Sequence, residues 1–264
     1  MSKFLFSIVV FLVSCASSQK IHSKYNGRKL VWSEEFNYNG LPDSTKWGYD
    51  TGGGGFGNNE LEYYTKADTT NAVVRDGKLF IKILNQKKEN RSYTSARILT
   101  KGKADWLYGL IEVRAKLPTG RGLWPAIWMM PAHAEYGKWP TSGEIDIMEN
   151  VGYNPDSVFT TIHTKSFNHI IGTQKSHGIY LKNSQSDFHL YGIDWNKDRI
   201  VFLIDKIPVF TFFNSGKGYE EWPFDKNFFF IINTAVGGNW GGRMGVDNTI
   251  FPAEMQIDYI RIYQ

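Results

Sequence analysis

Short runs in which apolar and polar residues alternate dominate the chain after about its first 30 residues. Over residues 111–117, apolar side chains alternate with Glu, Arg and Lys, the period of a half-buried β-strand. Similar runs occupy residues 71–84, 188–195, 200–204, 208–213, 228–233 and 256–263. Turn residues separate them at 76–77, 118–120, 196–198 and 237–238, and no long amphipathic helix is indicated. The pattern predicts an all-β fold, an antiparallel sandwich or barrel.

The N-terminal segment has a different pattern. Lys3 precedes an apolar run over residues 4–13, which is too short to span a bilayer as a helix. The run ends at Cys15, the one cysteine of the chain, and this ending resembles the lipobox of bacterial lipoproteins, which implies that Cys15 is lipidated. A plain secretory signal is the alternative, and both interpretations export the protein. A lone cysteine forms no internal disulfide.

These features predict the organisation of the chain. We expect a lipoprotein signal peptide over residues 1–14, a polar tether over 15–28 and a single β domain over 29–264. A lipid anchor would be the protein's one membrane contact, on the outer membrane or cell surface of a Gram-negative bacterium. No stretch rich in Pro, Ser or charge divides the remainder of the chain.

The composition restricts the kinds of partner that this protein is expected to bind. Hydrophobic residues make up 42% and charged residues 21%, as is ordinary for a soluble globular domain. The net charge is only +4 with both signs interspersed, so nucleic acid is not an expected partner, and we expect a monomer. The nine Trp, 14 Tyr and 18 Phe can either fill a β core or line a cleft.

The most informative segment is GEIDIMEN, residues 143–150. In a regular strand Glu144 and Asp146 share one face, and Ile145 and Ile147 point into the core. Strict alternation would send Glu149 into the core as well, where an unpaired carboxylate is costly. A β-bulge near residues 147–148 would return Glu149 to the face of the other two acids.

Three neighbouring acids repel one another, and the repulsion raises the pKa of at least one. A retaining glycosidase needs that split between an ionised nucleophile and a protonated acid, with carboxyl groups about 5–5.5 Å apart. A flat strand would hold them too far apart, so the sheet must curve. The alternative is a solvated strand edge whose acids oppose aggregation. Trp124, Trp128 and Trp139 favour the glycosidase, because indole faces stack on sugar rings.

With these motifs the chain resembles glycoside hydrolase family 16, specifically its laminarinase-like members. The acids match the family signature Glu-x-Asp-x-x-Glu, and similar motifs occupy residues 58–65, 94–97, 122–128, 235–240 and 257–263. The resemblance implies a β-jelly-roll sandwich of two curved antiparallel sheets with a concave substrate cleft. It implies a retaining, endo-acting glycoside hydrolase that cleaves β-1,3-glucan (laminarin), mixed-linkage β-1,3-1,4-glucan, or both, through a covalent glycosyl-enzyme.

The resemblance also assigns roles to residues. Glu144 would be the nucleophile, Glu149 the general acid and then base, and Asp146 a hydrogen-bond partner of the nucleophile. Substrate contacts are expected from polar and aromatic side chains: Asn59, Arg97, Trp124, Trp128, Trp139, His163, Asn233 and Trp240. Two of these have structural alternatives, because Arg97 can instead pair with a carboxylate and His163 can be a satisfied structural histidine.

No cofactor is expected for catalysis, and six scattered histidines with one cysteine indicate no zinc site. The resemblance implies a structural calcium on the convex face, held by Asp258 with Glu35 and the backbone near Gly77, unless Asp258 is simply a surface residue. Oxygen ligands of this kind suit calcium.

Two other functions remain open from the sequence. The chain could bind glucan without cleaving it, although all three acids are present. It could instead act on another polysaccharide, such as agar, carrageenan, porphyran or xyloglucan. Sulfated galactans call for basic residues, and the tryptophan-rich segment before Glu144 offers only Lys138 close to the acids. Transfer of the glycosyl group to a sugar instead of water also stays open.

Overall fold

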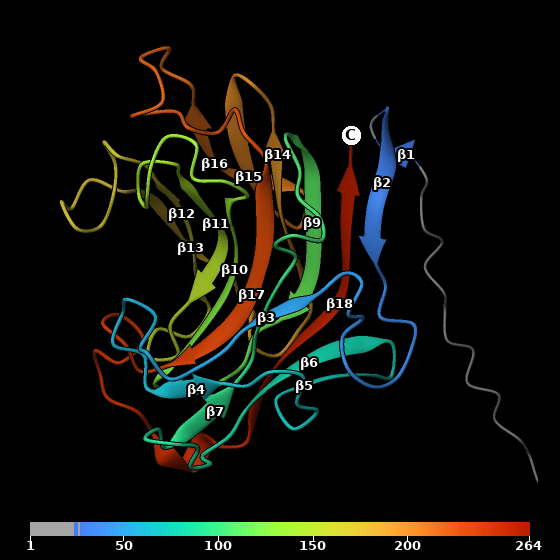
Figure 1. Ribbon diagram of the computed structural model, residues 1–264, viewed down its shortest axis with the longest axis vertical. Helices are drawn as coiled ribbons and strands as arrows, with labels where there is room; N and C mark the ends of the chain where they lie inside the picture. The colour runs from blue at the N-terminus through green and yellow to red at the C-terminus, as the bar shows by residue number, and fades with distance from the viewer. Residues whose placement is uncertain (1–23, 26) are drawn as a thin grey trace, which may run out of the picture.

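The computed structural model describes residues 24–25 and 27–264 as two layers of β-sheet packed face to face (Figure 1). The expected signal peptide and Cys15 lie outside the described residues. Among these residues, one 3-10 helix, η1 (Asn248–Ile250), is the whole helical content. No described helix has the length and apolar character needed to cross a bilayer.

The first sheet has nine strands, ordered β1-β2-β18-β9-β14-β15-β16, with β6 also paired to β18 and β5 paired to β6. Its strands are β1 (Lys24–Tyr25), β2 (Arg28–Glu34), β5 (Ala72–Arg75), β6 (Lys78–Ile83), β9 (Gly109–Lys116), β14 (His189–Trp195), β15 (Arg199–Ile204), β16 (Ile207–Phe213) and β18 (Ala253–Tyr263). The expected polar tether over 15–28 overlaps this sheet, because the chain turns at Gly27 and Lys24 pairs with Lys29.

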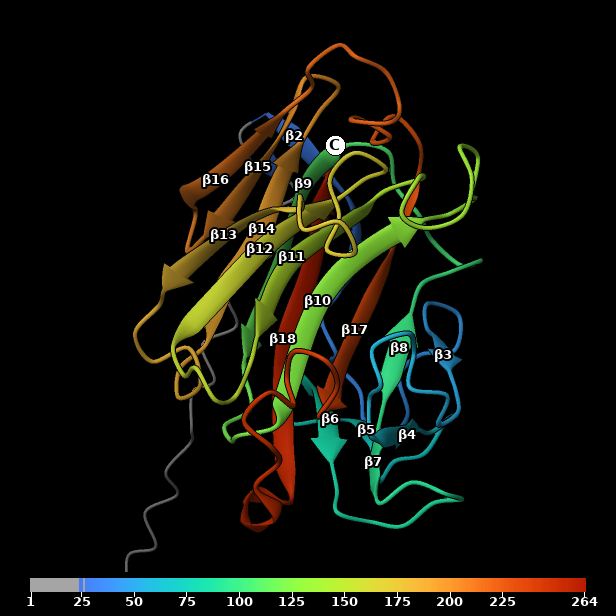
Figure 2. The same cartoon turned by 90° about the vertical axis from the view of Figure 1, so that its left-hand side faces the viewer.

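The second sheet has seven strands, ordered β13-β12-β11-β10-β17-β8-β3. They are β3 (Gly48–Asp50), β8 (Arg97–Leu99), β10 (Leu123–Pro131), β11 (Glu144–Asn150), β12 (Ser157–His163), β13 (Lys175–Tyr180) and β17 (Phe228–Val236). Two short strands, β4 (Glu62–Tyr64) and β7 (Tyr93–Ser95), form a separate parallel pair. Figure 2 shows β10, β11 and β12 side by side as long, curved strands.

The core lies between the two sheets and follows from strand alternation. In β9, Ile111, Val113 and Ala115 are fully buried, as the sequence pattern predicts. From the seven-stranded sheet, Ile127 and Ile145 join the same apolar cluster. Burial of one face of each sheet leaves the outer face of the seven-stranded sheet free to carry polar and aromatic side chains.

The expected all-β sandwich of curved antiparallel sheets is confirmed. The run at 71–84 is the hairpin β5–β6, with its turn at Asp76 and Gly77, both at positive φ. The sequence pattern did not single out β10, β12 and β13. β10 and β12 lie inside the sheet and lack a clean alternation of apolar and polar residues, whereas β13 is an exposed edge strand.

Candidate active site

The three acids lie on β11, between β10 and β12, and a β-bulge brings them to one face. Asp146 is opposite Trp128 and Met148 is opposite Ile127, so Ile147 is the extra residue. The β11–β12 register shifts at the same place. The bulge predicted near residues 147–148 is therefore confirmed. The alternative of a solvated strand edge is wrong, because β11 is an interior strand.

Gly143 sets the entry into β11. Its φ of 88° lies in the left-handed region that favours glycine. A Cβ atom there would also lie 2.8 Å from Pro223 Cγ and 2.9 Å from Phe224 Cε1. Any other residue would move the strand at the residue preceding Glu144.

An open cleft of about 520 Å³ lies over the acids on the outer face of the seven-stranded sheet. Its lining is supplied by the following residues: Phe56, Gly57, Asn58, Glu60, Arg97, Trp124, Ala126, Trp128, Met130, Trp139, Glu144, Asp146, Glu149, His169, Ile170, Asn233, Ala235 and Asn239. All three predicted tryptophans are among them. The volume is in the range of ordinary ligand-binding clefts.

Two tryptophans hold the outer carboxyls. Trp139 Nε1 donates a hydrogen bond to Glu144 Oε2. Trp124 Nε1 donates to Glu149 Oε1 at 3.0 Å. An indole N–H can only donate, so each bond orients an acceptor oxygen and favours the ionised carboxylate. The indoles therefore serve as hydrogen-bond donors as well as apolar walls for sugar rings.

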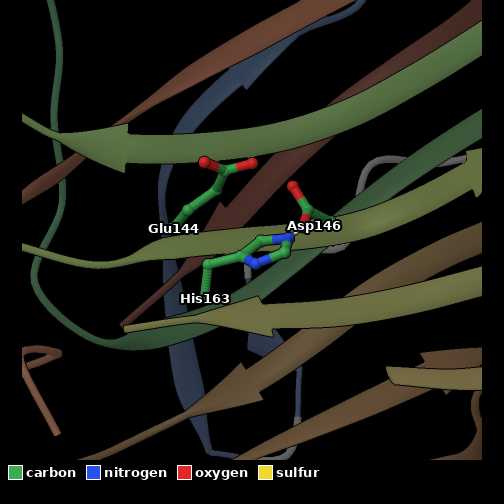
Figure 3. A group of neighbouring side chains, drawn as sticks. All are labelled: Glu144, Asp146 and His163. Carbon is green, nitrogen blue, oxygen red and sulfur yellow. Dashed lines mark ion pairs between the residues drawn. The ribbon is translucent and has the colours of Figure 1, made fainter. Parts of the chain in front are cut away.

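Asp146 lies between the two glutamates and is backed by a histidine. Figure 3 shows the His163 ring, from the neighbouring β12, turned towards Asp146, with Glu144 on the same strand as Asp146. His163 Nε2 lies 3.3 Å from Asp146 Oδ2, and the two residues are 6% and 3% exposed. Ligand atoms of Glu144, Asp146 and His163 all lie within 4.8 Å of one another, so they could also hold a metal ion. The same three side chains are also arranged for acid–base and nucleophilic chemistry, since two carboxyls and an imidazole can exchange protons.

Burial raises the pKa of all three acids. The pKa of Glu144 rises from 4.5 to about 8, through burial and then the charge of Asp146. That of Glu149 rises from 4.5 to about 7, chiefly through burial, and the Trp124 hydrogen bond opposes the rise. Burial and the charge of Glu149 raise the pKa of Asp146 well above its ordinary value. Such coupled groups lose protons as a set rather than singly.

The pKa of Glu144 lies above that of Glu149, the reverse of the order that the expected roles require. The three carboxyls share their protons, so the proton content of the set decides which of them is ionised. The Trp139 hydrogen bond lowers the pKa of Glu144 and favours its ionised form, whereas the charge and the hydrogen bond of Asp146 raise it. Glu149, with a pKa of about 7, then retains a proton to give.

Arg97 and Asn233 lie side by side where β8 meets β17. Arg97 Nε lies 2.9 Å from Asp50 Oδ2, and its guanidinium lies 4.7 Å from the Trp128 ring centroid. Arg97 thus pairs with a carboxylate, as its structural alternative predicts, and it also lines the cleft, where a contact with substrate stays a prediction. Asn233 accepts a hydrogen bond from Trp128 Nε1 at 2.8 Å.

Three predicted substrate residues do not line the cleft. His163 is buried behind Asp146, which agrees with its structural alternative. Trp240 packs its ring edgewise on Trp124, with centroids 5.5 Å apart, and so supports a wall residue. Asn59 is exposed and donates to Asn239, which is itself in the lining.

Comparison with known proteins agrees with this geometry. The family model described as "Glycosyl hydrolases family 16" matches residues 59–261. The chain belongs to glycosyl hydrolase family 16. A family 16 relative, the β-glucanase of Rhodothermus marinus, is 50% identical over 243 residues, which cover 89% of this chain and 85% of that protein.

Solved structures of family 16 enzymes superpose closely on this fold. The laminarinase from Rhodothermus marinus gives a TM-score of 0.88 at 50% identity and covers 90% of this chain and 97% of its own. SCLam, a non-specific endo-β-1,3(4)-glucanase, gives 0.87 at 43% identity and covers 91% and 96%. That structure is of an SCLam mutant co-crystallised with 1,3-β-D-cellotriosyl-glucose, and it presents a 1,3-β-D-cellobiosyl-glucose at its active site.

Several residues of the cleft were not predicted from the sequence. Glu60 lies within the family motif at 58–65, but a buried carboxyl there carries no signal of its own. His169 and Ile170 come from the loop between β12 and β13, and the His169 ring lies 5.1 Å from that of Trp139. A loop without periodicity gives no indication of the surface that it approaches.

The residues expected at a calcium site meet on the nine-stranded sheet. β6 pairs with the first half of β18 and β2 with the second half, which leaves Asp258 between them. Gly77 lies in the turn that leads into β6, and Glu35 follows β2 directly. The Glu35 carboxylate accepts bonds of 3.0 and 2.9 Å from Arg261, so Glu35 could offer a cation only its main-chain carbonyl. Asp258 Oδ2 accepts from Arg114.

The raised pKa values predict a pH-dependent cost to stability. Because folding raises the pKa of Glu144 from 4.5 to about 8, the folded chain binds more protons than the unfolded chain in that window. The contribution is present in full at low pH and is lost as pH rises through the folded pKa. Glu144→Gln should therefore be more stable than the parent at pH 8, by on the order of 1 kcal/mol or about 2–4 °C in Tm, and match it near pH 4.

Thermal unfolding followed by circular dichroism across this pH range measures the difference. Glu135→Gln, at an exposed loop residue, is the matched control and should track the parent at every pH. Parallel curves for Glu144→Gln and the parent would contradict the raised pKa.

Proposed function

We propose that this family 16 chain is a retaining endo-β-1,3(4)-glucanase. The observation that carries the proposal is the β11 bulge, which places Glu144, Asp146 and Glu149 on one face at the floor of an open, tryptophan-lined cleft. The names of its relatives, a β-glucanase, a laminarinase and an endo-β-1,3(4)-glucanase, support the substrate class.

In the first step, a Glu144 carboxylate oxygen attacks the anomeric carbon and Glu149 gives its proton to the glycosidic oxygen. The C–O bond breaks, the shortened glucan leaves, and a glycosyl ester forms on Glu144. Trp139 holds the attacking carboxylate by a hydrogen bond. Burial keeps the Glu149 proton in place near neutral pH.

In the second step, Glu149, now ionised, removes a proton from water, which attacks the same carbon and releases Glu144. Two displacements restore the β configuration at the anomeric carbon. The Trp124 N–H stabilises ionised Glu149 between the steps, since it donates to Glu149 Oε1. A sugar hydroxyl in place of water would give transglycosylation by the same route.

The test is reducing-end release from laminarin, barley mixed-linkage glucan, xyloglucan and agarose in parallel, with Glu144→Gln as control. We expect oligosaccharides from laminarin, the mixed-linkage glucan or both, and none from the control. If the folded protein released no reducing ends from either glucan, the proposal would be contradicted. Binding without release, unchanged in Glu149→Gln, would indicate a glucan-binding protein instead.

We also propose that the protein is exported and lipid-anchored through Cys15. The support is the sequence of residues 1–15, in which a basic residue and an apolar run precede the cysteine. The full-length protein expressed in a Gram-negative host should fractionate with membranes, and Cys15→Ala should not. A Cys15→Ala protein that stays membrane-bound, or processing that globomycin does not inhibit, would overturn the anchor.

We propose a structural calcium ion at the junction of β2, β6 and β18, supported by the convergence of Asp258, Glu35 and Gly77. One carboxylate with main-chain carbonyls is a donor set that calcium accepts. Removal of calcium with EGTA should lower Tm by about 5 °C or more, because a ligand that binds only the folded state stabilises it. Asp258→Asn should abolish the difference in Tm between samples with calcium and with EGTA. A parent Tm that EGTA does not change would count against the site.

A further inference from the structure

A chain of hydrogen bonds runs from the cleft wall to a buried carboxyl that the proposed mechanism does not use. Trp128 Nε1 donates to Asn233 Oδ1 at 2.8 Å. Asn233 Nδ2 donates in turn to Tyr64 Oη at 3.0 Å. Tyr64 Oη then donates to Glu60 Oε2 at 2.9 Å. Trp128, Asn233 and Glu60 all line the cleft, and Tyr64 is fully buried beneath them.

The two ends of this chain fix its direction. An indole N–H can only donate and an ionised carboxylate can only accept. The carbonyl of Asn233 must therefore face Trp128, and its amide nitrogen must face Tyr64. If the amide turned over, its NH₂ group would face the Trp128 N–H and two donors would be left unpaired in a buried place. One amide orientation is thus selected.

The carboxylate at the end of the chain belongs to a buried pair with Glu62. Glu62 is fully buried, and its Oε2 accepts from the Val236 N–H at 2.5 Å, while its Oε1 has no hydrogen-bond partner. That unpartnered oxygen is where a proton is least costly. Burial and the charge of Glu60 both raise the pKa of Glu62 well above its ordinary value. Glu62 is therefore the neutral member of the pair.

Glu60 is accordingly the ionised member. Burial raises the pKa of Glu60, but the hydrogen bond from Tyr64 and the charge of Arg97 act in the opposite direction. Glu60 is only 4% exposed, so its place is set by these partners rather than by solvent. The pair thus holds one proton, on Glu62, and presents Glu60 as the fixed acceptor for Tyr64.

The consequence falls on the part of the cleft where β8 meets β17. Asn233 lies opposite Arg97 in the register of β8 and β17. One of its N–H groups donates to Tyr64, and its carbonyl oxygen accepts from Trp128. It keeps one donor and one acceptor, both with a fixed orientation, for sugar hydroxyls. An amide free to turn over would present these two groups in either order and would discriminate less between hydroxyl patterns.

We propose that Glu60 is a positioning residue, which acts through Tyr64 to fix the orientation of the Asn233 amide against the bound glucan. The inference rests on the proposed glucanase activity. The activity of the parent enzyme distinguishes failure of one proposal from failure of the other. An inactive parent contradicts the glucanase activity, and an active parent whose variants have unchanged kinetics contradicts the positioning role.

The experiment compares Tyr64→Phe, Glu60→Met, Glu60→Gln and the double variant Glu60→Met/Tyr64→Phe on a linear β-1,3-gluco-oligosaccharide. Tyr64→Phe removes a single oxygen and deletes the central link of the chain. Glu60→Met removes the acceptor at similar length, and Glu60→Gln keeps a carbonyl that can accept from Tyr64. The matched control is Tyr63→Phe, the same change one residue away, where the ring faces Lys88 instead.

We expect Tyr64→Phe and Glu60→Met each to raise KM about tenfold with kcat within about twofold of the parent. Glu60→Gln and Tyr63→Phe should stay close to the parent. The double variant should be no worse than Tyr64→Phe alone, because both changes break the same chain.

Additive losses in the double variant, unchanged KM values, or losses confined to kcat would each overturn the proposal. Thermal unfolding identifies any variant that has failed to fold. If Glu60→Met is one of these, Tyr64→Phe and Glu60→Gln decide the matter, since a purely structural defect would not spare Glu60→Gln while raising KM in Tyr64→Phe.

Discussion

Glu144→Ala is expected to lower kcat on laminarin by on the order of 10⁴-fold or more, because no covalent intermediate forms without the attacking carboxylate. The loss should appear in kcat rather than in KM, since the tryptophan walls and Arg97 remain in the cleft. Initial rates on a linear oligosaccharide measure both constants. Glu112→Gln, at a buried glutamate of the other sheet, is the control for loss of a buried carboxylate and should keep its activity.

Azide then tests the role of Glu144 and not only its importance. In Glu144→Ala, azide can occupy the vacated space and attack the anomeric carbon of an aryl β-glucoside from the nucleophile's side. One displacement in place of two gives an α-configured glycosyl azide. A β-configured product would show that Glu149, not Glu144, is the nucleophile, and the proposed roles would have to be exchanged.

The acidic strand shows how far physical reasoning from sequence can reach. The period of β-strands and the cost of a buried charge were enough to predict the bulge near Ile147, because Glu149 had no other tolerable place. The order of roles between Glu144 and Glu149 did not follow from spacing. It came from the family resemblance, because the two acids lie on the same face, are buried to a similar extent and each accept a hydrogen bond from a tryptophan of their own.

Other parts of the site depend on contacts between distant segments. Trp240 and His163 carry the residue types expected of sugar contacts, but packing sets Trp240 edgewise on Trp124 and buries His163 behind Asp146. Glu60 looked unremarkable in sequence, although it is buried at the end of the chain through Tyr64. Local pattern gives the face of a strand on which a side chain lies, but only the packed neighbours decide what it touches.

The tryptophans illustrate the same limit from the other direction. Their proximity to Glu144 in sequence indicated a sugar-binding surface, and all three do line the cleft. The partners of their N–H groups could not be predicted from sequence, and these partners differ. Trp124 and Trp139 donate to Glu149 and Glu144, whereas Trp128 donates to Asn233. Trp124 and Trp139 thus each offer a ring for stacking on sugars and an N–H donor for a carboxylate.

Glu149→Ala should lower kcat on glucan by about 10²–10⁴-fold, because the departing sugar alkoxide then leaves without a proton. The loss should be much smaller for bond cleavage in an aryl glucoside with an acidic phenol, which needs no proton to leave. For the parent, activity requires protonated Glu149, so kcat/KM should fall as pH rises through about 7. That alkaline limb should be absent in Glu149→Ala.

The pH profile, taken with azide, separates Glu149 from its neighbours in the carboxyl cluster. Azide should restore turnover of the aryl glucoside by Glu149→Ala and give a β-configured azide, because it replaces water in the second displacement and needs no base. Asp146→Asn also changes the charge next to Glu144, but it leaves the general acid in place. It should therefore retain the alkaline limb and gain nothing from azide. If Glu149→Ala kept the limb and Asp146→Asn lost it, the titrating acid would be Asp146, and the role of general acid given to Glu149 would be wrong.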